Sequence, residues 1–443
     1  MRIDKIVGGE LKKKPKLRRV KMNTTIFAEK QESFQTKTDC VLCLALDVGE
    51  GMLRNGDNVH HVEETIIRIC NAYGSAHVET FVISTLILAS VRMNDGSYSS
   101  QMRRVYDNVN NMSMLENFNS LSRRICAEKP DFDTAQQMLR ETKNKRIYSR
   151  WLTVLSSALG AGSSAILFGG SWRDGLAGGI VGLVLGLLFL FKLENITALA
   201  KTLIYSFIAG NISYLTVLAR IGENADMVMI GSIMLLIPGL AFGNALRDLL
   251  CGDIMTGMLK TVQSCLTAAL VACGYTGAML IMNRFGVESG LPAIEYNFAI
   301  GILTALVVTL SFSAVFRVRP KVLWVAALGG GAAYGIYILF GFIGAPLFVC
   351  AFTCSLFAAI YAEVCARLCK VPAIVFLTPS IIPVVPGRYL YYTMSSLVNG
   401  NNGMIFEYAS KTLSISAGIV VGSIFVMMIM TVKNHWNTQN GLK

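Results

Sequence analysis

The chain has 443 residues, of which 53% are hydrophobic and 15% are charged, and its formal net charge is +12. This composition is too apolar and too poor in charge for an ordinary soluble protein. A basic excess is typical of the cytoplasmic loops of membrane proteins, so we do not expect nucleic acid as a partner. Charges are frequent before about Tyr148 and rare after it. The sequence predicts an α-helical integral membrane protein with a smaller polar region at its N-terminus.

Residues 1–38 form a basic polar tail in which lysine and arginine cluster between Lys12 and Lys21. No aromatic side chains are interleaved with this cluster, and the stretch lacks the apolar core of a signal peptide. We expect a solvated tail, or one that touches lipid headgroups.

Residues 39–148 show the pattern of a small cytoplasmic α+β domain. Apolar residues recur at helical spacing in four segments, and two β-branched runs before the turn Asn94-Asp95-Gly96 are typical of strands. The expected helices cover Asp39–Arg54, Asp57–Tyr73, Ser113–Ala127 and Asp133–Lys143. About a hundred residues suffice for a core of its own.

Ten segments after this domain are long and apolar enough to span a bilayer, which takes about twenty residues. They are Trp151–Ser171, Gly175–Leu193, Thr197–Ala219, Met227–Leu246, Met258–Met282, Phe298–Phe316, Val322–Gly341, Pro346–Leu368, Ala373–Met394 and Leu413–Val432. The loop Asn283–Glu295 divides them into two five-helix repeats, residues 149–283 and 296–433.

The two halves are related in sequence at an offset of 148 residues, which sets Pro238 against Pro386. Further identities at this offset are Ser232/Ser380, Ile233/Ile381, Gly239/Gly387, Leu249/Leu397 and Gly252/Gly400. Positive charges gather in the loops on the side of the N-terminal domain, which predicts cytoplasmic N- and C-termini. Because five spans is an odd number, the second half enters the membrane from the opposite side. The sequence thus predicts inverted repeats, an arrangement that many secondary transporters use.

Each half contains a proline-glycine break inside an apolar span, at Pro238-Gly239 and at Pro386-Gly387. A break at this depth is tolerated where protein or a water-filled cavity receives the freed backbone groups. The new half-helix after each break offers N–H groups to a carboxylate, and the carbonyls of Met234 and Ile382 could accept from an ammonium group. Such a site suits a zwitterion such as an amino acid, and it could also serve a dicarboxylate.

Four polar residues follow the first break. Asn244 and Asp248 share a helical face, and we expect them to contact substrate or, for Asp248, a coupling proton, because polar residues inside a membrane are costly. Arg247 and Asp253 have two equal interpretations, a functional role or solvated charges at the end of the span.

After the second break, Arg388 and Tyr389 are substrate-binding candidates, although Arg388 could instead extend to the lipid interface. Glu363 and Asp253 are further candidates for proton coupling, the alternative for Glu363 being an interfacial charge. No metal or cofactor is expected. The pair His60-His61 lacks the His-Glu-x-x-His zinc pattern, and Cys40-x-x-Cys43 lacks a second ligand pair.

The run Gly49-Glu50-Gly51-Met52-Leu53-Arg54-Asn55-Gly56, followed by Val62-Glu63-Glu64-Thr65, resembles the opening motif of the threonine/serine exporter family. His61 stands where members of that family commonly have arginine. Ile237-Pro238-Gly239, with Asn244, Asp248, Gly252-Asp253 and Gly257, resembles the family's fourth-span motif.

The second half, with Thr378-Pro379, Pro383 and Val385-Pro386-Gly387, is similar to the family's smaller partner domain, which some members carry as a separate chain. The resemblance covers roughly Asp39 to the C-terminus. It implies efflux of threonine and serine driven by the proton-motive force, and related split-chain members are associated with dicarboxylate export.

These observations predict a multi-pass exporter of small polar metabolites in the cell membrane, most simply of threonine and serine, that works by alternating access. Its expected partners are a small-molecule substrate, protons and the lipid bilayer, and a homo-oligomer is an option. The alternatives are a dicarboxylate exporter, a passive channel with a cytoplasmic sensor, and a membrane-embedded hydrolase. The hydrolase would need a nucleophile–base pair that the sequence does not reveal, so we do not expect an enzyme.

Overall fold

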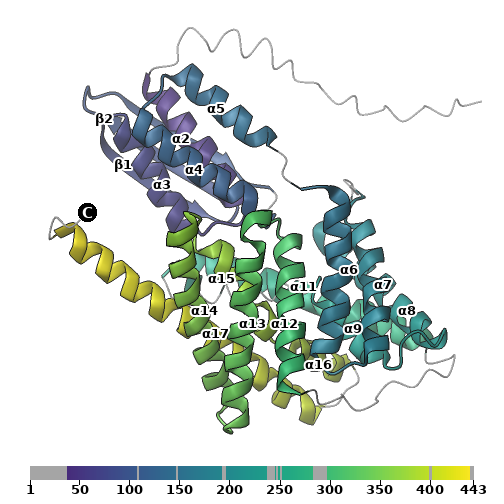
Figure 1. Ribbon diagram of the computed structural model, residues 1–443. Coiled ribbons are helices and arrows are strands. Elements are labelled where there is room, and N and C mark those ends of the chain that lie inside the picture. The colour runs from purple at the N-terminus through teal and green to yellow at the C-terminus, as the bar shows by residue number, and fades with distance from the viewer. Residues whose placement is uncertain are drawn as a thin grey trace, which may run out of the picture.

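The computed structural model describes residues 37–106, 109–145, 148–191, 196–236, 245, 248–249, 252–282, 297–398 and 402–439. Figure 1 shows a small unit of helices and strands stacked on one end of a larger body of helices. We call these parts the N-terminal unit and the helical body. The end of the body next to the N-terminal unit is the near end, and the opposite end is the far end. The predicted basic tail lies outside the described residues except at its last two positions.

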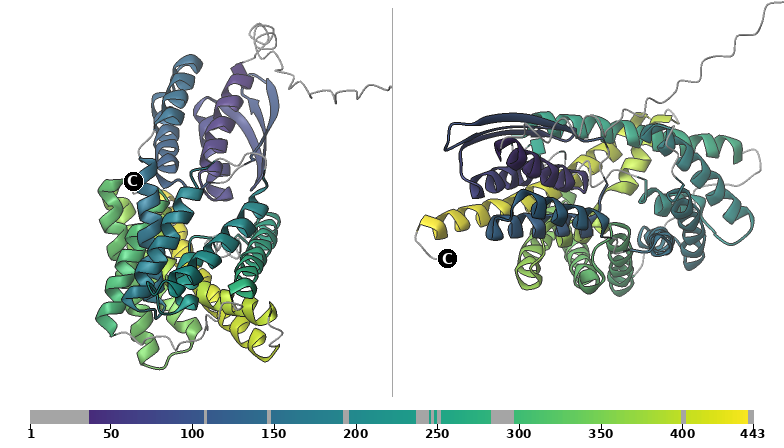
Figure 2. Two further views of the ribbon diagram at one scale, coloured as in Figure 1. Left: turned by 90° about the vertical axis from the view of Figure 1, so that its right-hand side faces the viewer. Right: turned by 90° about the horizontal axis from the view of Figure 1, so that it is seen from above.

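The N-terminal unit combines helices with a three-stranded antiparallel sheet in the order β1-β2-β3. Its described elements are α2 (Lys37–Arg54), α3 (Val59–Ala72), β1 (Ser75–Ile83), β2 (Leu86–Met93), β3 (Tyr98–Arg104), α4 (Met112–Glu128) and α5 (Phe132–Asn144). The four helices predicted from apolar spacing are confirmed to within two residues at each end. Figure 2 shows the sheet lying along one side of the helices of the unit.

Strand β3 does not follow from the sequence pattern, because polar side chains occupy its inner face. Gln101 donates to the carbonyl oxygen of Asp39 over 3.1 Å, and Arg103 pairs with Asp47 over 3.3 Å. Both partners belong to α2. Polar contacts with that helix therefore hold the strand in place of the apolar alternation that sequence reasoning requires.

The start of α4 fixes the N-terminal unit to the helical body. The Met112 N–H donates to the carbonyl of Phe316 over 2.9 Å, and the Arg319 guanidinium pairs with Glu116 over 2.7 Å. Burial raises the pKa of the Glu116 carboxyl, and the charge of Arg319 opposes that rise. One buried apolar cluster continues from the unit into the body through Val318. The unit is thus packed against the body rather than tethered to it.

The helical body carries the predicted membrane spans. Its described elements are α6 (Arg150–Leu167), α7 (Trp172–Leu188), α8 (Ala198–Leu218), α9 (Ala225–Ile233), α11 (Ile254–Met282), α12 (Phe298–Val315), α13 (Pro320–Phe342), α14 (Leu347–Cys369), α15 (Ile374–Ile381), the 3₁₀ turn η2 (Ile382–Val384), α16 (Gly387–Val398) and α17 (Asn402–Gln439). Each of the ten predicted spans overlaps these elements.

Five helices in the described part of the chain are long and apolar enough to cross a membrane, namely α11, α12, α13, α14 and α17. The bent pair formed by α15 and α16 raises this number to six if it is one span. The protein is therefore a mostly helical membrane protein, while the total of ten spans stays a prediction.

The two halves repeat the same succession of helices. The starts of α6 and α12, α7 and α13, α8 and α14, α9 and α15, and α11 and α17 are each 148 or 149 residues apart. In each half the first helix packs on the second, the third packs on the fifth, and the fourth contacts the first three. The structural register thus agrees with the sequence offset.

Two pairs of equivalent helices, α6 with α12 and α11 with α17, run in opposite directions. Contacts with the N-terminal unit, or with the linker that follows it, show which end of each helix lies at the near end. The Tyr148 hydroxyl, just before α6, donates to the carbonyl of Val318, just after α12. Helix α11 begins beside Glu63 of the N-terminal unit, whereas its equivalent α17 approaches that unit late in its course, at Ser423 to Met427. Helix α6 therefore leads from the near end to the far end, and α12 leads back.

The third and fifth helices of each half approach closely through a glycine and a serine. A Cβ atom at Gly274 would overlap the hydroxyl of Ser206, and one at Gly422 would overlap the hydroxyl of Ser355. The two glycines are equivalent at the offset of 148, and the two serines are one residue from it. Small residues let membrane helices pack backbone to backbone, and here both halves use the same device.

Candidate functional site

The break at Pro386 in the second half is confirmed. Helix α15 ends at Ile381, η2 follows, and α16 starts at Gly387 with its axis bent by 50°. The expectation of a free carbonyl at Ile382 was wrong, because this oxygen accepts from the Val385 N–H over 3.1 Å in the 3₁₀ turn. In the first turn of α16 the Gly387 N–H donates to the carbonyl of Val385 over 2.7 Å. Among the described residues, the N–H groups of Arg388 and Tyr389 are therefore the backbone donors that the break leaves for a ligand.

Arg388 extends from the first turn of α16 toward the first half of the protein. Its guanidinium donates to the carbonyl of Phe168, the C-terminal cap of α6, over 3.4 Å, and to the Tyr389 hydroxyl over 3.2 Å. It also lies 5.1 Å from the centre of the Tyr389 ring. The half-buried Arg388 side chain thus bridges the two halves near the far end, which favours a role in the protein interior over an interfacial one.

Three further tyrosines, Tyr334, Tyr337 and Tyr392, lie close enough to Arg388 to interact with it electrostatically. Tyr334 and Tyr337 of α13 stack on each other with centroids 6.0 Å apart, and Tyr391 and Tyr392 of α16 lie 5.6 Å apart. Tyrosine side chains give the surroundings of Arg388 an apolar character and also supply hydroxyl groups for hydrogen bonds.

Asp226 is a polar residue of this region that the sequence analysis missed. It lies in the first turn of α9, where its carboxylate is close enough to Tyr391 and Tyr392 to interact with both electrostatically. No hydrogen bond or ion pair within the described residues engages that carboxylate. The predicted fourth span begins one residue later, at Met227, which left Asp226 in a loop; a single acid at the start of an apolar run was the available signal.

The first break cannot be followed in the same detail. Helix α9 ends at Ile233, and the candidates Pro238, Gly239 and Asn244 lie outside the described residues. Asp248 is described and buried. Lys260 of α11 donates to the carboxylate of Asp248 over 2.7 Å. The Asp248 side chain is 8% exposed and the Lys260 side chain is 21% exposed. Asp248 is therefore half of a largely buried ion pair.

Asp253 lies at the near end, where the N-terminal unit meets the segment before α11. Burial and the charge of Asp248 raise the pKa of the Asp253 carboxyl, while His60 and Lys260 oppose the rise. Burial also raises the pKa of Glu63. The Val82 N–H, which donates to the Glu63 carboxylate, opposes this rise, and the charge of Asp253 adds to it. The charge of Asp253 thus disfavours the ionised form of Glu63 across this contact.

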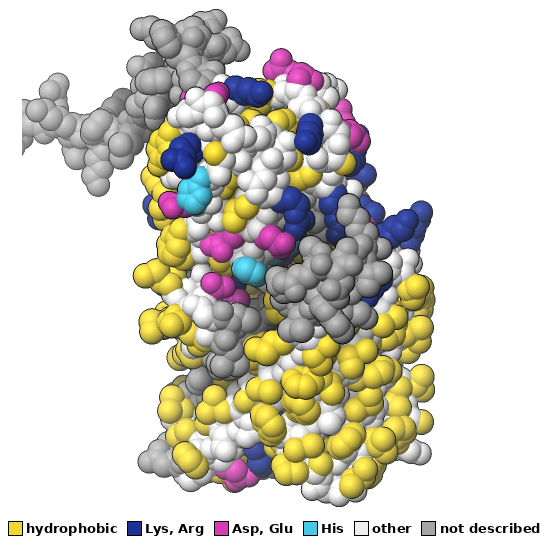
Figure 3. All heavy atoms as spheres, turned by 90° about the vertical axis from the view of Figure 1, so that its left-hand side faces the viewer, with side chains coloured by type: hydrophobic (Ala, Val, Ile, Leu, Met, Phe, Trp, Pro, Cys, Tyr) yellow, Lys and Arg dark blue, Asp and Glu magenta, His cyan; other side chains and the backbone are white. Residues whose placement is uncertain are grey.

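Glu363 lies elsewhere at the near end. It lines a cavity of about 580 Å³ between the N-terminal unit and helices α14, α15 and α17, which we call the junction cavity. Figure 3 shows acidic and histidine side chains gathered on this side of the molecule, above a surface covered by hydrophobic side chains.

The structure therefore separates the predicted site residues into two regions. Arg388 and Tyr389 lie toward the far end together with Asp226, whereas Asp248, Asp253 and Glu363 lie toward the near end. Helix α6, which leads from one end to the other, has 18 residues and is about 27 Å long at 1.5 Å per residue. The candidates thus occupy two separate regions of the body rather than one compact pocket.

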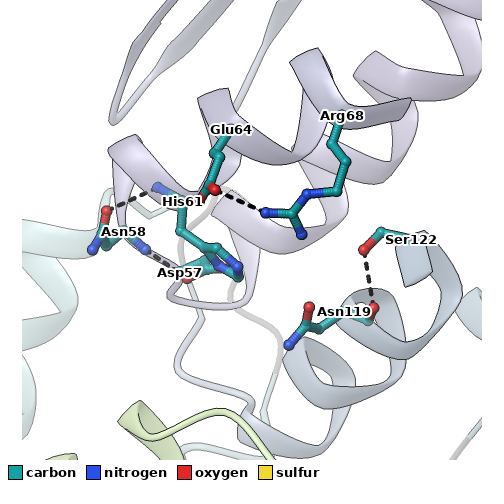
Figure 4. A network of polar contacts seen from close by, with 7 residues as sticks. All are labelled: Asp57, Asn58, His61, Glu64, Arg68, Asn119 and Ser122. Carbon is teal, nitrogen blue, oxygen red and sulfur yellow. Dashed lines mark hydrogen bonds and ion pairs between the residues drawn. The ribbon is translucent and has the colours of Figure 1, made fainter. Parts of the chain in front are cut away.

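The N-terminal unit brings a histidine, an aspartate and a serine near one another. His61 Nδ1 bonds to Asp57 Oδ2 over 2.8 Å, but the nearby Ser122 hydroxyl donates to the carbonyl of Asn119 instead of approaching the histidine (Figure 4). Among the described residues, no group of three or more His, Cys, Asp or Glu side chains could hold a metal ion.

A helical membrane body with two similar halves, a broken helix and isolated charges on its interior defines a membrane transport protein. Two family models match the chain, "Putative threonine/serine exporter" over residues 43–282 and "Threonine/Serine exporter, ThrE" over residues 301–429. The chain belongs to the threonine/serine exporter family, and it contains both halves.

Curated relatives agree with this assignment. The chain is 21% identical to a "Probable threonine/serine exporter" of Mycobacterium tuberculosis and 23% identical to a "Threonine/serine exporter" of Corynebacterium glutamicum. Both matches cover 86% of this chain, and they cover 75% and 81% of those proteins. It is also 26% identical to a "Probable succinate transporter subunit YjjP" of Klebsiella aerogenes, over 59% of this chain and 98% of that protein. No solved structure matches the chain significantly.

Proposed function

We propose that this protein exports threonine and serine from the cytosol by alternating access between two inverted five-helix halves, with the proton-motive force as its energy source. The observation that carries the proposal is the match of the exporter family models to both halves, residues 43–282 and 301–429. The printed names of the relatives from Mycobacterium tuberculosis and Corynebacterium glutamicum support the same substrates.

The inverted arrangement is supported by the helix directions. Helix α6 runs from near end to far end and its equivalent α12 runs back, and α11 and α17 are opposed in the same sense. Ten spans, with the N-terminal unit and both termini in the cytoplasm, agree with the positive charges of the near-end loops. The near end then faces the cytosol, and the far end faces outward.

The proposed transport route leads through the body from the near end to the far end, and at its outward part it would bind a zwitterion by opposite charges. The Arg388 guanidinium, with the backbone N–H groups of Arg388 and Tyr389, suits the carboxylate of an amino acid, and Asp226 suits its ammonium group. Pro386 shapes the outward part of the route. Substrate release outward would require Arg388 to separate from the carbonyl of Phe168, which ties the two halves together at this end.

At the cytosolic end, the route would begin at the segment after the first break, where Pro238, Gly239 and Asn244 complete the proposed site. Asp248, Asp253 and Glu363 are the carboxylates that could carry a proton there.

A dicarboxylate is the second candidate substrate. The match to nearly the whole length of a probable succinate transporter subunit favours it, and Arg388 would serve a carboxylate of either substrate class. Asp226 argues against it, since an unpaired carboxylate beside the route would repel a dianion.

Counterflow in proteoliposomes tests the proposal. Vesicles loaded with unlabelled threonine or serine should take up external labelled threonine or serine. Vesicles loaded with succinate should not do so, and labelled succinate should not enter any of the vesicles. Arg388→Gln should reduce the exchange at least tenfold through the loss of a charged hydrogen-bonding partner. Arg173→Gln is the matched control, because Arg173 is exposed and pairs with Glu223 at the surface. Exchange of succinate alone would refute threonine and serine as substrates and favour dicarboxylates. No exchange of any of the three by protein that is shown to be folded would refute the proposal.

A further inference from the structure

The junction cavity has walls of two kinds. The N-terminal unit supplies polar side chains from the start of α3 and from α4, among them Asp57, His61 and Arg123. The helical body supplies a mainly apolar floor, with Ile374, Leu377 of α15 and Val426 of α17, interrupted by Glu363. The cavity is thus a space shared by two parts of the protein that are far apart in the sequence.

Much of the charge around the cavity is already satisfied. Figure 4 shows His61 directed at Asp57 and Glu64 directed at Arg68, with distances of 2.8 Å in both pairs. Asn58 caps α3 by accepting from the His61 N–H over 3.2 Å, so the helix N-terminus is not open for an anion.

Two opposite charges in the lining have no such partner. No hydrogen bond or ion pair made by the described residues engages Arg123 on the side of the N-terminal unit or Glu363 on the side of the helical body. They belong to different parts of the protein, so a ligand that contacts both would span the junction.

We propose that the junction cavity binds a free α-amino acid from the cytosol, with the ligand carboxylate at Arg123 and its ammonium group at Glu363. A volume of about 580 Å³ accommodates a small amino acid with water around it, and the apolar floor accepts its side chain. The inference rests on the proposed function for the choice of threonine as ligand. The site shares Glu363 with the coupling candidates at the cytosolic end, and it is separate from the outward part of the route marked by Arg388.

Occupation of this site would act on the moving part of the exporter. The floor of the cavity includes Ala373, Ile374 and Leu377, at the cytosolic start of the span that breaks at Pro386. A ligand that ties these residues to the N-terminal unit stabilises one position of that helix relative to the others. The N-terminal unit thereby adjusts export to the amino-acid concentration in the cytosol.

Hydrogen exchange on the full-length protein in nanodiscs tests the site, with threonine, succinate and ethanolamine as probes. Threonine should slow exchange in residues 57–64, 119–123 and 372–377, whereas succinate and ethanolamine, which each lack one of the two charges, should not. Arg123→Ala should raise the threonine concentration needed for half of this protection by roughly tenfold or more. The matched control is Arg124→Ala, because the neighbouring Arg124 is exposed and pairs with Glu128 on its own helix.

Three results would overturn the proposal: no protection by threonine, equal protection in Arg123→Ala, or equal protection by either probe with a single charge. Protection that depends on phosphatidylethanolamine in the nanodisc and not on threonine would assign the cavity to a lipid headgroup and also overturn it. The two proposals fail separately. Protection that requires Arg123 without threonine counterflow would leave this site standing and refute the export of threonine, and the converse result would refute the site alone.

Discussion

The ion pair between Asp248 and Lys260 offers a test that separates a structural role from a role in transport. We consider three variants, Asp248→Asn, Lys260→Gln and the double variant with both changes. The amide side chains keep nearly the same size and remove the charge, so they isolate electrostatics from packing. In the wild type, Lys260 Nζ lies 2.7 Å from Asp248 Oδ2. Each single variant removes one of these two charges and leaves the other without its partner.

The expected cost follows from the burial of the two groups. Removing one partner of a buried ion pair costs about 3–5 kcal/mol. Lys260 keeps about a fifth of its side chain exposed, so water relieves part of the penalty, and we expect about 3 kcal/mol for each single variant. The double variant leaves no unpaired charge and should lose only about 1 kcal/mol, which corresponds to a large coupling energy between the two sites.

Two assays on the same variants complete the test. Denaturant unfolding in detergent should show both single variants destabilised and the double variant largely restored. Gradient-driven threonine flux should then decide the role of Asp248. If Asp248 carries the coupling proton, the stable double variant stays inactive; if the pair is only structural, the double variant transports. Single variants as stable as the wild type would refute the reasoning, since the pair would then contribute nothing.

Three further predictions concern stability, each measured as the change in thermal unfolding of the full-length protein. Burial opposes the charged form of His61, but hydrogen bonding to Asp57 outweighs it and raises the pKa of His61. This pair therefore stabilises the fold fully below about pH 6.5, and the stabilisation is lost as the pH rises through the raised pKa. His61→Gln should reduce the free energy of unfolding by about 1 kcal/mol in acidic solution, and this difference from the wild type should shrink in alkaline solution. Gly422→Val should cost about 3 kcal/mol by forcing α14 and α17 apart, whereas Gly341→Ala, with open space around it, should be neutral. Asp174→Ala should cost about 3 kcal/mol, because its buried carboxylate accepts from three backbone N–H groups, and an equal effect on an exposed aspartate would contradict this explanation.

Features with a local or periodic cause could be predicted from the sequence. The break at Pro386 follows from the missing backbone donor of proline, and its position in the structure agrees with that expectation. The register of the repeat follows from the identities at an offset of 148 residues, such as Pro238 and Pro386, and the helix starts reproduce it to within one residue. The helices of the N-terminal unit follow from apolar spacing of period 3.6.

Features that depend on contacts between distant residues could not be predicted. The bond from Arg388 to Phe168 joins residues 220 positions apart, and nothing in either local sequence indicates it. Strand β3 carries polar inner side chains whose partners lie on α2, so it has no pattern of its own. Asp226 lies just before the predicted fourth span, and its closeness to Tyr391 and Tyr392 depends on the packing of α16 beside α9. The junction cavity exists only because the N-terminal unit packs against the second half.

The central claim is that the protein is a secondary exporter, and accumulation of threonine under a pH gradient tests it most directly. A gradient of one pH unit supplies about 1.4 kcal/mol per proton, enough for roughly tenfold accumulation for each proton coupled to one substrate. Proteoliposomes with equal threonine on both sides should therefore concentrate it when the gradient is imposed and lose it when the gradient is collapsed. Threonine that only equilibrates, at the same rate with and without the gradient, would show a passive channel and contradict the account.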